Sequence, residues 1–188
     1  MDGRTNKRYC REIVMNKLYD IKSADMPLAY DVPLDNPLEI YKVCKRMEIT
    51  CKYKNGIGLS AVQVGIPWKL FIIQGMNSRN PLVKQGTTSY FVNCEYEGIT
   101  DEGRVVSSEG CLSIRSDEGQ LRLFRVERFR TIRLYGLQLI EENNKLKLDK
   151  IDINIKLEED SVVFQHEIDH NFGKLISDSN IGKEIFMY

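Results

Sequence analysis

Histidine is scarce in this chain, with only two among 188 residues. No apolar run approaches the ~20 residues that a membrane-spanning helix needs, and the first twenty residues lack a hydrophobic stretch followed by a small-residue cleavage site. The 27 basic and 27 acidic residues cancel, so net charge gives no argument for a nucleic-acid or membrane partner. We therefore expect a cytoplasmic protein without membrane association or direct nucleic-acid binding.

Paired cysteines are also lacking. The five cysteines are odd in number and contain no Cys-x-x-Cys pair, which argues against a disulfide framework and a cysteine-only zinc site. Most of them are expected to be small buried thiols. They are Cys10, Cys44, Cys51, Cys94 and Cys111.

The chain has the length and composition of one domain covering residues 1–188. Its apolar fraction of 42% suits a soluble globular protein, and no linker, repeat or low-complexity segment divides it. "DNPLEIYKVCKRMEITCKYKNG" predicts a helix with Asn36 as N-cap and Pro37 at its first position, ending at Asn55 and Gly56.

The rest of the sequence predicts several strands followed by one more helix. "KLFIIQG" and "SYFVNCEYEG" predict strands, and the segment 105–157 alternates apolar and polar residues in three runs typical of antiparallel strands with one wet face. A helix is expected from Glu158, with acidic residues in its first turn, Val162, Val163 and Phe164 inside, and Gly173 at its end. The predicted fold class is α+β, with antiparallel or mixed β-sheets packed around this helix.

Both histidines lie on that last helix, in the pattern His-Glu-x-x-His. The four-residue spacing puts the imidazoles of His166 and His170 on one face, where they can bind one metal ion. Glu167 between them is available as a general base. A catalytic site normally has three protein ligands, so the third one decides the interpretation.

Several third ligands can be considered. Ile176 stands where a metzincin would have a histidine, and Glu184 lies in a tail too short to form the helix that a thermolysin-like site requires. Upstream, "SSEGCLSI" places Cys111 after a glycine in a turn-like segment from which its sulfur could project. A thiolate with two imidazoles would leave one coordination position open. Taken alone, Cys111 would be interpreted as an ordinary buried thiol in preference to a ligand.

Three stretches together carry a family resemblance. "GIGLSAVQ" (56–63), "EGCLS" (109–113) and "QHEIDH" (165–170) resemble, in order and spacing, the three motifs of peptide deformylases. These metalloenzymes remove the formyl group from the N-terminal methionine of new polypeptides. The resemblance covers roughly residues 37–178 and implies one divalent metal ion per chain. Fe2+ is the expected native ion, while Zn2+, Ni2+ or Co2+ could occupy the site in purified protein. The implied ligands are Cys111, His166 and His170.

The resemblance also implies a mechanism on N-formyl-methionyl peptides. Water held by the metal would attack the formyl carbonyl, and Glu167 would pass its proton to the leaving amine, releasing formate. The Gln63 side-chain amide and the Leu112 backbone N–H would stabilise the developing oxyanion.

A further set of positions matches the family's substrate groove. Gly56, Ile57 and Gly58 would bind the peptide as an extra strand. Val162 and Val163 would wall the methionine pocket together with Ile57 and Leu112. Glu109 and Arg128 could be surface charges, which is the commoner case, or Glu109 could brace the active-site loop and Arg128 could pair with an acid near the cleft. Asp169 could face outward or support a neighbouring loop.

The chain departs from the family pattern in four places. Ser60 replaces an alanine, Cys94 follows Asn93 where proline is common, and "RSDEGQLRLFRVER" is a longer link that could cover or widen the cleft. The chain ends with "LISDSNIGKEIFMY", which puts in doubt the ribosome contact that many bacterial members make through a long final helix. Compact forms also occur among virus-encoded and organellar members.

Two other interpretations remain. The first is a different metallohydrolase, such as a peptidase, with an acidic third ligand beside His166 and His170. The second is a binding module or a structural metal site. Glu167 and Gln63 favour an enzyme, because a structural site needs neither.

Overall fold

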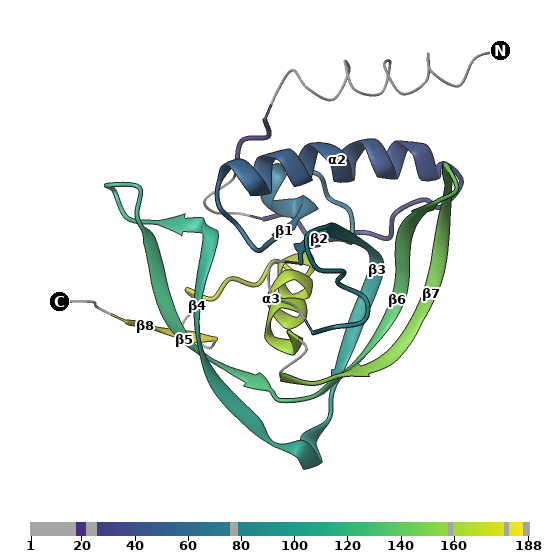
Figure 1. Ribbon diagram of the computed structural model, residues 1–188. Helices are drawn as coiled ribbons and strands as arrows, with labels where there is room; N and C mark the ends of the chain where they lie inside the picture. Colours follow the sequence, from purple (N-terminus) through teal and green to yellow (C-terminus); the bar gives the residue numbers. More distant parts are fainter. Residues whose placement is uncertain (1–17, 22–25, 76–78, 158–159, 179–180, 186–188) are drawn as a thin grey trace.

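Two antiparallel sheets enclose a central helix in this protein (Figure 1). The computed structural model describes residues 18–21, 26–75, 79–157, 160–178 and 181–185. The larger sheet has the strand order β1-β2-β3-β6-β7 and the smaller one β4-β5-β8. The strands of the larger sheet are β1 (Gly58–Ser60), β2 (Leu70–Gln74), β3 (Thr88–Gly98), β6 (Ile132–Glu142) and β7 (Lys145–Ile155). Those of the smaller sheet are β4 (Arg104–Arg115), β5 (Leu121–Phe129) and β8 (Gly182–Ile185).

The helices are α2 (Pro37–Tyr53) and α3 (Ser161–Asn171), with two short 3-10 helices, η1 (Ala61–Val64) and η2 (Thr100–Glu102). Helix α3 lies between the two sheets, while α2 packs on the outside of the larger one (Figure 1). The expected α+β class is confirmed, and all strand pairs in both sheets are antiparallel.

Helix α2 forms as the sequence predicts. The Asn36 side chain accepts a hydrogen bond from the backbone N–H of Glu39 at 3.2 Å, and Pro37 is the first helical residue. The buried face includes Ile40, Cys44 and Met47, which are 0–1% exposed and face strand residues of the larger sheet. Burying these side chains anchors the helix that leads into the first motif.

The segment 105–157, for which the sequence predicted three alternating runs, forms most of four strands, β4 to β7. Strands β2 and β3 match the two predicted apolar runs. Strand β6 continues through Gly136, whose φ of 145° brings its backbone close to Cys94. A Cβ at Gly136 would lie 2.6 Å from the Cys94 Cα, so the close approach of β6 to β3 at this point requires glycine.

The predicted start of the metal-binding helix was wrong. Helix α3 begins at Ser161 and has no acidic residue in its first turn. Asp160 has a left-handed φ of 68°, which a right-handed helix cannot include. The expected end is confirmed, since Gly173 has φ 69° and its N–H donates to the His170 carbonyl at 3.0 Å. Glu158 and the residue after it lie outside the described residues.

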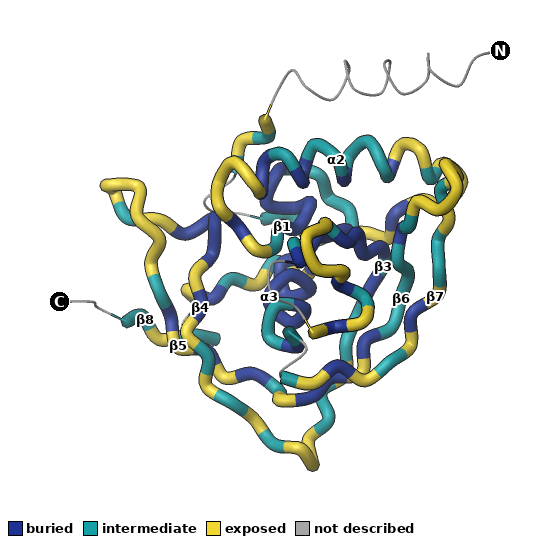
Figure 2. The backbone as a smooth tube through the Cα atoms, viewed as in Figure 1, coloured by how far each residue is buried: buried dark blue, intermediate teal, exposed yellow. Residues whose placement is uncertain are grey.

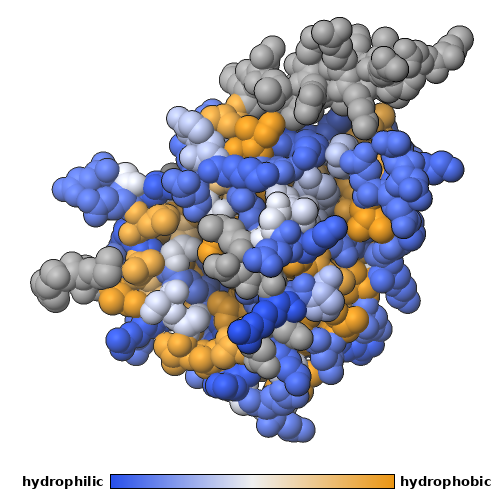
Figure 3. Space-filling view, viewed as in Figure 1, coloured by the Kyte–Doolittle hydropathy of each residue, from blue (hydrophilic) through white to orange (hydrophobic). Residues whose placement is uncertain are grey.

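The centre of the molecule is unusually polar. Helix α3 is buried almost throughout in Figure 2, although most of its residues after Phe164 are polar. Buried polar groups need partners, so this concentration marks a site and not a plain core. On the face drawn in Figure 3, apolar residues form separate groups among hydrophilic ones.

Two further expectations can be compared with the structure. Cys44, Cys51, Cys94 and Cys111 are free and buried, as expected, and Cys10 lies outside the described residues. Within the described part of the chain, no helix is long and apolar enough to cross a membrane.

Candidate active site

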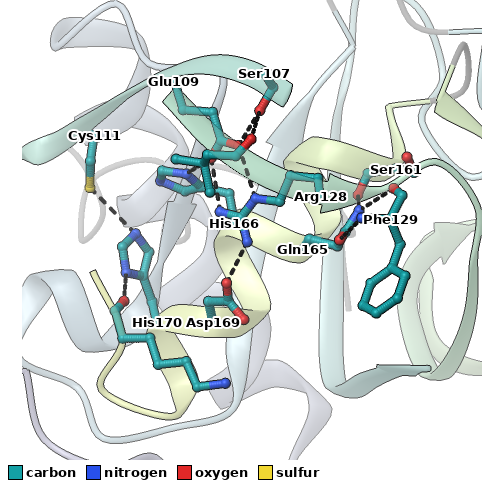
Figure 4. Close-up of polar contacts among 12 residues, drawn as sticks. Ser107, Glu109, Cys111, Arg128, Phe129, Ser161, Gln165, His166, Asp169 and His170 are labelled. Atoms are coloured by element: carbon teal, nitrogen blue, oxygen red, sulfur yellow. Dashed lines mark hydrogen bonds and ion pairs between the residues drawn. The ribbon is translucent and has the colours of Figure 1, made fainter. Parts of the chain in front are cut away.

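An irregularity in β4 positions Cys111. Gly110 pairs with Leu123 of β5, but the next paired residue of β4 is Arg115, opposite Leu121. Residues 111–114 therefore face a single residue of β5 and leave the regular ladder. The sequence suggested a turn here, and the structure has a bulged strand with the same consequence. The Cys111 Sγ lies 3.4 Å from the His170 Nε2 (Figure 4).

Helix α3 presents the two imidazoles to this sulfur. The ligand atoms of Cys111, His166 and His170 all lie within 4.8 Å of one another. The His166 Nδ1 contacts the Glu109 Oε2 at 2.9 Å, and the His170 Nδ1 donates to the Lys174 carbonyl at 3.0 Å. With Nδ1 engaged in this way, each Nε2 is the nitrogen available to a metal.

The chemistry of this donor set fits a divalent ion. Burial opposes ionisation of the Cys111 thiol, but hydrogen bonds with His166 and His170 outweigh it and lower the pKa of Cys111 to about 5. The thiolate is the form that binds metals. Two imidazoles and one thiolate leave a tetrahedral ion with one open position, as in catalytic sites.

Glu167 adjoins the cluster without belonging to it. Its side chain is buried, and its Oε2 has no hydrogen-bond partner. Burial raises the pKa of Glu167 to about 7, although the nearby imidazoles oppose this increase. A carboxylate with a pKa near neutrality and an unused oxygen can accept a proton from a reacting group.

The Gln63 side chain has a fixed orientation beside the same cluster. Its Oε1 accepts a hydrogen bond from the Ser60 backbone N–H at 2.8 Å, which turns the Nε2 towards β4. The Nε2 donates to the Ser113 Oγ at 3.1 Å and lies 3.4 Å from the Cys111 Sγ. Leu112 lies in the same bulge and is 8% exposed. Both candidate oxyanion donors are thus next to the Cys-His-His cluster.

A buried ion-pair network supports the first histidine (Figure 4). Arg128 donates to both oxygens of Glu109 at 2.9 Å and to the Asp169 Oδ2 at 2.5 Å. Tyr96 donates to the other oxygen of Asp169 at 3.2 Å. Burial alone would raise the pKa of Glu109, but Arg128 and His166 lower it to about 2. Glu109 therefore stays ionised as the hydrogen-bond acceptor of His166.

The network settles two open interpretations of the sequence. Arg128 is paired with acids, as suggested, and is 4% exposed. Asp169 does not face outward, because it is buried against Arg128 and Tyr96. Tyr96 was missed, since it belongs to no motif and lies 73 residues from its partner.

A cavity of about 310 Å³ opens beside Glu167 and His166. All the expected substrate-binding residues line it, together with others that the sequence did not single out. The expected ones are Gly56, Ile57, Gly58, Glu109, Val162 and Val163. The additional ones are Asn55, Ser108, Gly110, Leu121 and Leu123. The long link after the second motif therefore does reach the cleft, as the β4–β5 hairpin.

The departures from the motif pattern are accommodated locally. The Ser60 hydroxyl donates to the Asn171 side-chain oxygen at 3.2 Å in a fully buried position. Glu184, the only downstream acid considered as a ligand, forms a two-point ion pair with Arg122 at 2.6 and 2.5 Å. It is thus engaged on β8, while the cluster found among the described residues has a cysteine as its third donor.

A buried Cys-His-His cluster, a neighbouring carboxylate and an adjoining cavity are typical of a metal-dependent hydrolase. The comparisons with known proteins agree. The family model described as polypeptide deformylase matches residues 29–184. The chain belongs to the peptide deformylase family, whose enzymes remove the N-formyl group from nascent chains and depend on a metal ion.

Individual relatives show the same relationship. The peptide deformylase of Pseudoalteromonas translucida is 31% identical over 141 residues, which cover 74% of this chain and 71% of that protein. The crystal structure of peptide deformylase from Thermotoga maritima has a TM-score of 0.63 and 26% identity, covering 87% and 97% of the two chains. A Met-Ala-Ser-bound peptide deformylase from Acinetobacter baumannii shares the fold, with a TM-score of 0.67, 23% identity and coverage of 86% and 97%.

Proposed function

We propose that residues 1–188 form one catalytic domain that deformylates N-formyl-methionyl peptides at the cluster on α3. Cys111, His166 and His170 would bind one divalent ion, for which we propose Fe2+ as the native species and Zn2+, Ni2+ or Co2+ as substitutes in purified protein. A bound divalent ion supplies Lewis acidity, which activates water near neutral pH. The convergence of the three donor atoms within 4.8 Å, beside the unpartnered oxygen of Glu167, carries this proposal.

Glu167 acts as the general base in this proposal. Its unpartnered Oε2 takes the proton of the attacking water and then gives it to the departing amine of methionine. The raised pKa of Glu167 suits both halves of this transfer, because the carboxyl must accept and release one proton near neutrality. The products are formate and a peptide with a free amino terminus.

Gln63 and Leu112 stabilise the charge that develops on the formyl oxygen. The Ser60 N–H holds the Gln63 amide with its Nε2 towards the cluster, so little reorientation is needed during the reaction. The Leu112 N–H belongs to the bulge that no regular β5 partner faces. Such preorganised donors are typically worth about 10²–10³ in rate each.

The peptide binds along β1, the edge strand of the larger sheet. Gly56, Ile57 and Gly58 would lie along the added strand, and Val162 and Val163 would form the apolar wall of the methionine pocket, since all five residues line the cavity. Glu109 contributes indirectly, through its contact with His166. Since the substrate is a nascent chain, we expect the enzyme to act in the cytoplasm or in an organelle that makes formylated chains.

The test is amine release from formyl-Met-Ala-Ser and from Met-Ala-Ser, with protein loaded anaerobically with Fe2+ or Ni2+. We expect turnover of the formylated peptide only. Glu167→Gln should keep its metal and lose about 10²–10⁴ in kcat, whereas Cys111→Ala should lose metal. Metal-loaded wild-type protein that leaves the formyl group intact would overturn the proposal, and cleavage within Met-Ala-Ser would indicate a peptidase.

A further inference from the structure

One buried hydrogen bond joins the first sequence motif to the end of α3. The Ser60 hydroxyl donates to the Asn171 Oδ1 at 3.2 Å, and the two residues are 0% and 1% exposed. Ser60 is the last residue of β1 and directly precedes η1, which carries Gln63. Asn171 is the last residue of α3 and directly follows His170. The contact therefore connects the element that bears Gln63 to the helix that bears both histidines.

Ser60 also holds the Gln63 side chain, through its own backbone. The Ser60 N–H donates to the Gln63 Oε1 at 2.8 Å, so the orientation of the Gln63 amide follows the position of the Ser60 backbone. On its other side the Gln63 Nε2 donates to the Ser113 Oγ at 3.1 Å and lies 3.4 Å from the Cys111 Sγ. A shift of Ser60 would thus move the Nε2 relative to the Cys-His-His cluster.

Asn171 is a fixed point for this contact. Its backbone carbonyl accepts a hydrogen bond from the Ala29 N–H at 2.9 Å, which holds the end of α3 in place. The Ser60 hydroxyl can donate or accept, so the contact persists in either orientation of the Asn171 amide. The Asn171 Nδ2, however, is buried without a hydrogen-bond partner. An unpaired buried donor costs stability, so stability alone does not explain an asparagine at this position.

An oxyanion donor works only if it is already aimed at the place where charge develops, and small displacements reduce the rate. We propose that Ser60 and Asn171 are positioning residues that hold the Gln63 amide at its place beside the cluster. Without their hydrogen bond, Ser60 and η1 can shift against α3, and the Gln63 amide shifts with them. This inference rests on the proposed deformylase function, in which Gln63 stabilises the developing oxyanion.

The experiment places Asn171→Leu in two backgrounds, wild type and Gln63→Ala, and measures KM and kcat per bound Ni2+ with formyl-Met-Ala-Ser. Leucine has the branched shape of asparagine but cannot form the hydrogen bond. In the wild-type background we expect kcat to fall about fivefold, which is less than the loss of a whole donor, with KM unchanged because the oxyanion exists only in the transition state. In the Gln63→Ala background we expect no further loss, since the side chain through which Asn171 acts is absent.

Ser60→Ala removes the other partner of the hydrogen bond and should reproduce this pattern. The double variant Ser60→Ala/Asn171→Leu should be no slower than the slower single variant, because both substitutions remove the same contact. Ser89→Ala is the matched control. Ser89 is a buried serine of β3 in the same sheet, and among the described residues no hydrogen bond joins its side chain to Gln63 or α3, so its kcat should equal that of wild type.

The inference fails if Asn171→Leu and Ser60→Ala both keep the wild-type kcat per bound Ni2+. It also fails if Asn171→Leu lowers kcat equally in both backgrounds, which would indicate a general effect on the fold and not an effect through Gln63. Effects of the two single substitutions that multiply in the double variant would likewise contradict a shared contact. Wild-type protein that binds Ni2+ but does not turn over the formylated peptide would instead refute the proposed function itself.

Discussion

The buried carboxylate of Glu167 is the clearest sign of function in a single side chain. A buried polar oxygen without a partner usually costs about 1–3 kcal/mol, so folding alone does not favour it. Here the Glu167 Oε2 is such an oxygen, and it lies beside the cavity and the three side chains that we propose bind the metal. The unpartnered oxygen lowers the stability of the fold, but it leaves Glu167 free to accept a proton from a reacting group.

Gly58 allows this carboxylate to sit where it does. A Cβ at Gly58 would lie 2.2 Å from the Glu167 Oε1 and 2.7 Å from its Cδ, which no real contact permits. We expect Gly58→Ala to displace the carboxylate and lower kcat at least tenfold, while the protein still binds its metal. Steady-state kinetics with metal analysis of the same sample checks this. Unchanged kcat at full metal content would show that Glu167 has more freedom than the structure indicates.

Sequence analysis brought together the residues that are part of motifs. The His-Glu-x-x-His spacing predicted that His166 and His170 share one face of a helix beside Glu167, and the three-motif resemblance added Cys111, which the structure places beside the two histidines. Tyr96 and Leu121 could not be found in this way. Tyr96 meets Asp169 only after β3 has paired within the larger sheet, and Leu121 reaches the cavity only because β4 bulges opposite it. Both contacts depend on strand register, which local patterns do not determine.

At the scale of whole elements, the side chain of Gln165 attaches α3 to β5. The Gln165 Oε1 accepts from the Phe129 N–H and its Nε2 donates to the Phe129 carbonyl, both at 2.9 Å. Phe164 beside it packs edge-on against Phe71 and Phe91 of the larger sheet. One turn of α3 thus contacts both sheets, which fixes the helix that bears the two histidines.

Helix α2 has a charged group whose contribution to stability depends on pH. Burial would raise the pKa of Glu48, but hydrogen bonds from Lys45, Lys52 and Tyr90 lower it to about 2. Because the folded pKa lies below the unfolded value near 4.5, the stabilisation is complete above that pH and is lost as pH falls towards 2. The effect should be on the order of 1–2 kcal/mol, since both lysines are partly exposed.

Glu48→Gln tests this directly. We expect the difference in unfolding free energy between wild type and variant to be constant from pH 7 to about pH 5.5 and then to shrink as pH falls below 4.5. Urea unfolding of both proteins across this range measures it, and effects common to both, including metal loss in acid, cancel. A difference that stays constant down to pH 3 would rule out an ionised Glu48 as its source.

Element boundaries were predicted well only where local chemistry determines them. Asn36 and Pro37 start α2 through a cap and a fixed φ, and Gly173 ends α3 through its left-handed backbone. The start of α3 was misplaced because Glu158 looks like a favourable first-turn residue. Asp160 adopts φ 68° instead, and the Ser161 Oγ donates to the Arg130 carbonyl at 3.0 Å, a contact that the sequence does not reveal.

At the scale of the whole molecule, the proposed metal-binding cluster brings together residues that are distant in the chain. Cys111 comes from the smaller sheet, while His166 and His170 belong to the helix packed between both sheets. The described polypeptide has no disulfide, because its four cysteines are free. If the proposed ligands bind a metal ion, that ion would cross-link β4 and α3, and its binding energy would add to the stability of the fold.

Removal of the metal should therefore lower the melting temperature. A ligand at one hundred times its dissociation constant stabilises the folded state by about 2.7 kcal/mol, which corresponds to a shift of roughly 5–10 °C for a chain of this size. We expect a chelator to produce such a shift in wild-type protein, as followed by differential scanning calorimetry, and re-addition of Ni2+ to reverse it. Cys111→Ala should melt at the lower temperature with or without the chelator, because it lacks the ligand that connects the smaller sheet to α3. If the chelator removes the metal from wild-type protein without changing its melting temperature, the cluster contributes to chemistry alone, and the contacts of Gln165 and Phe164 suffice to hold α3 between the sheets.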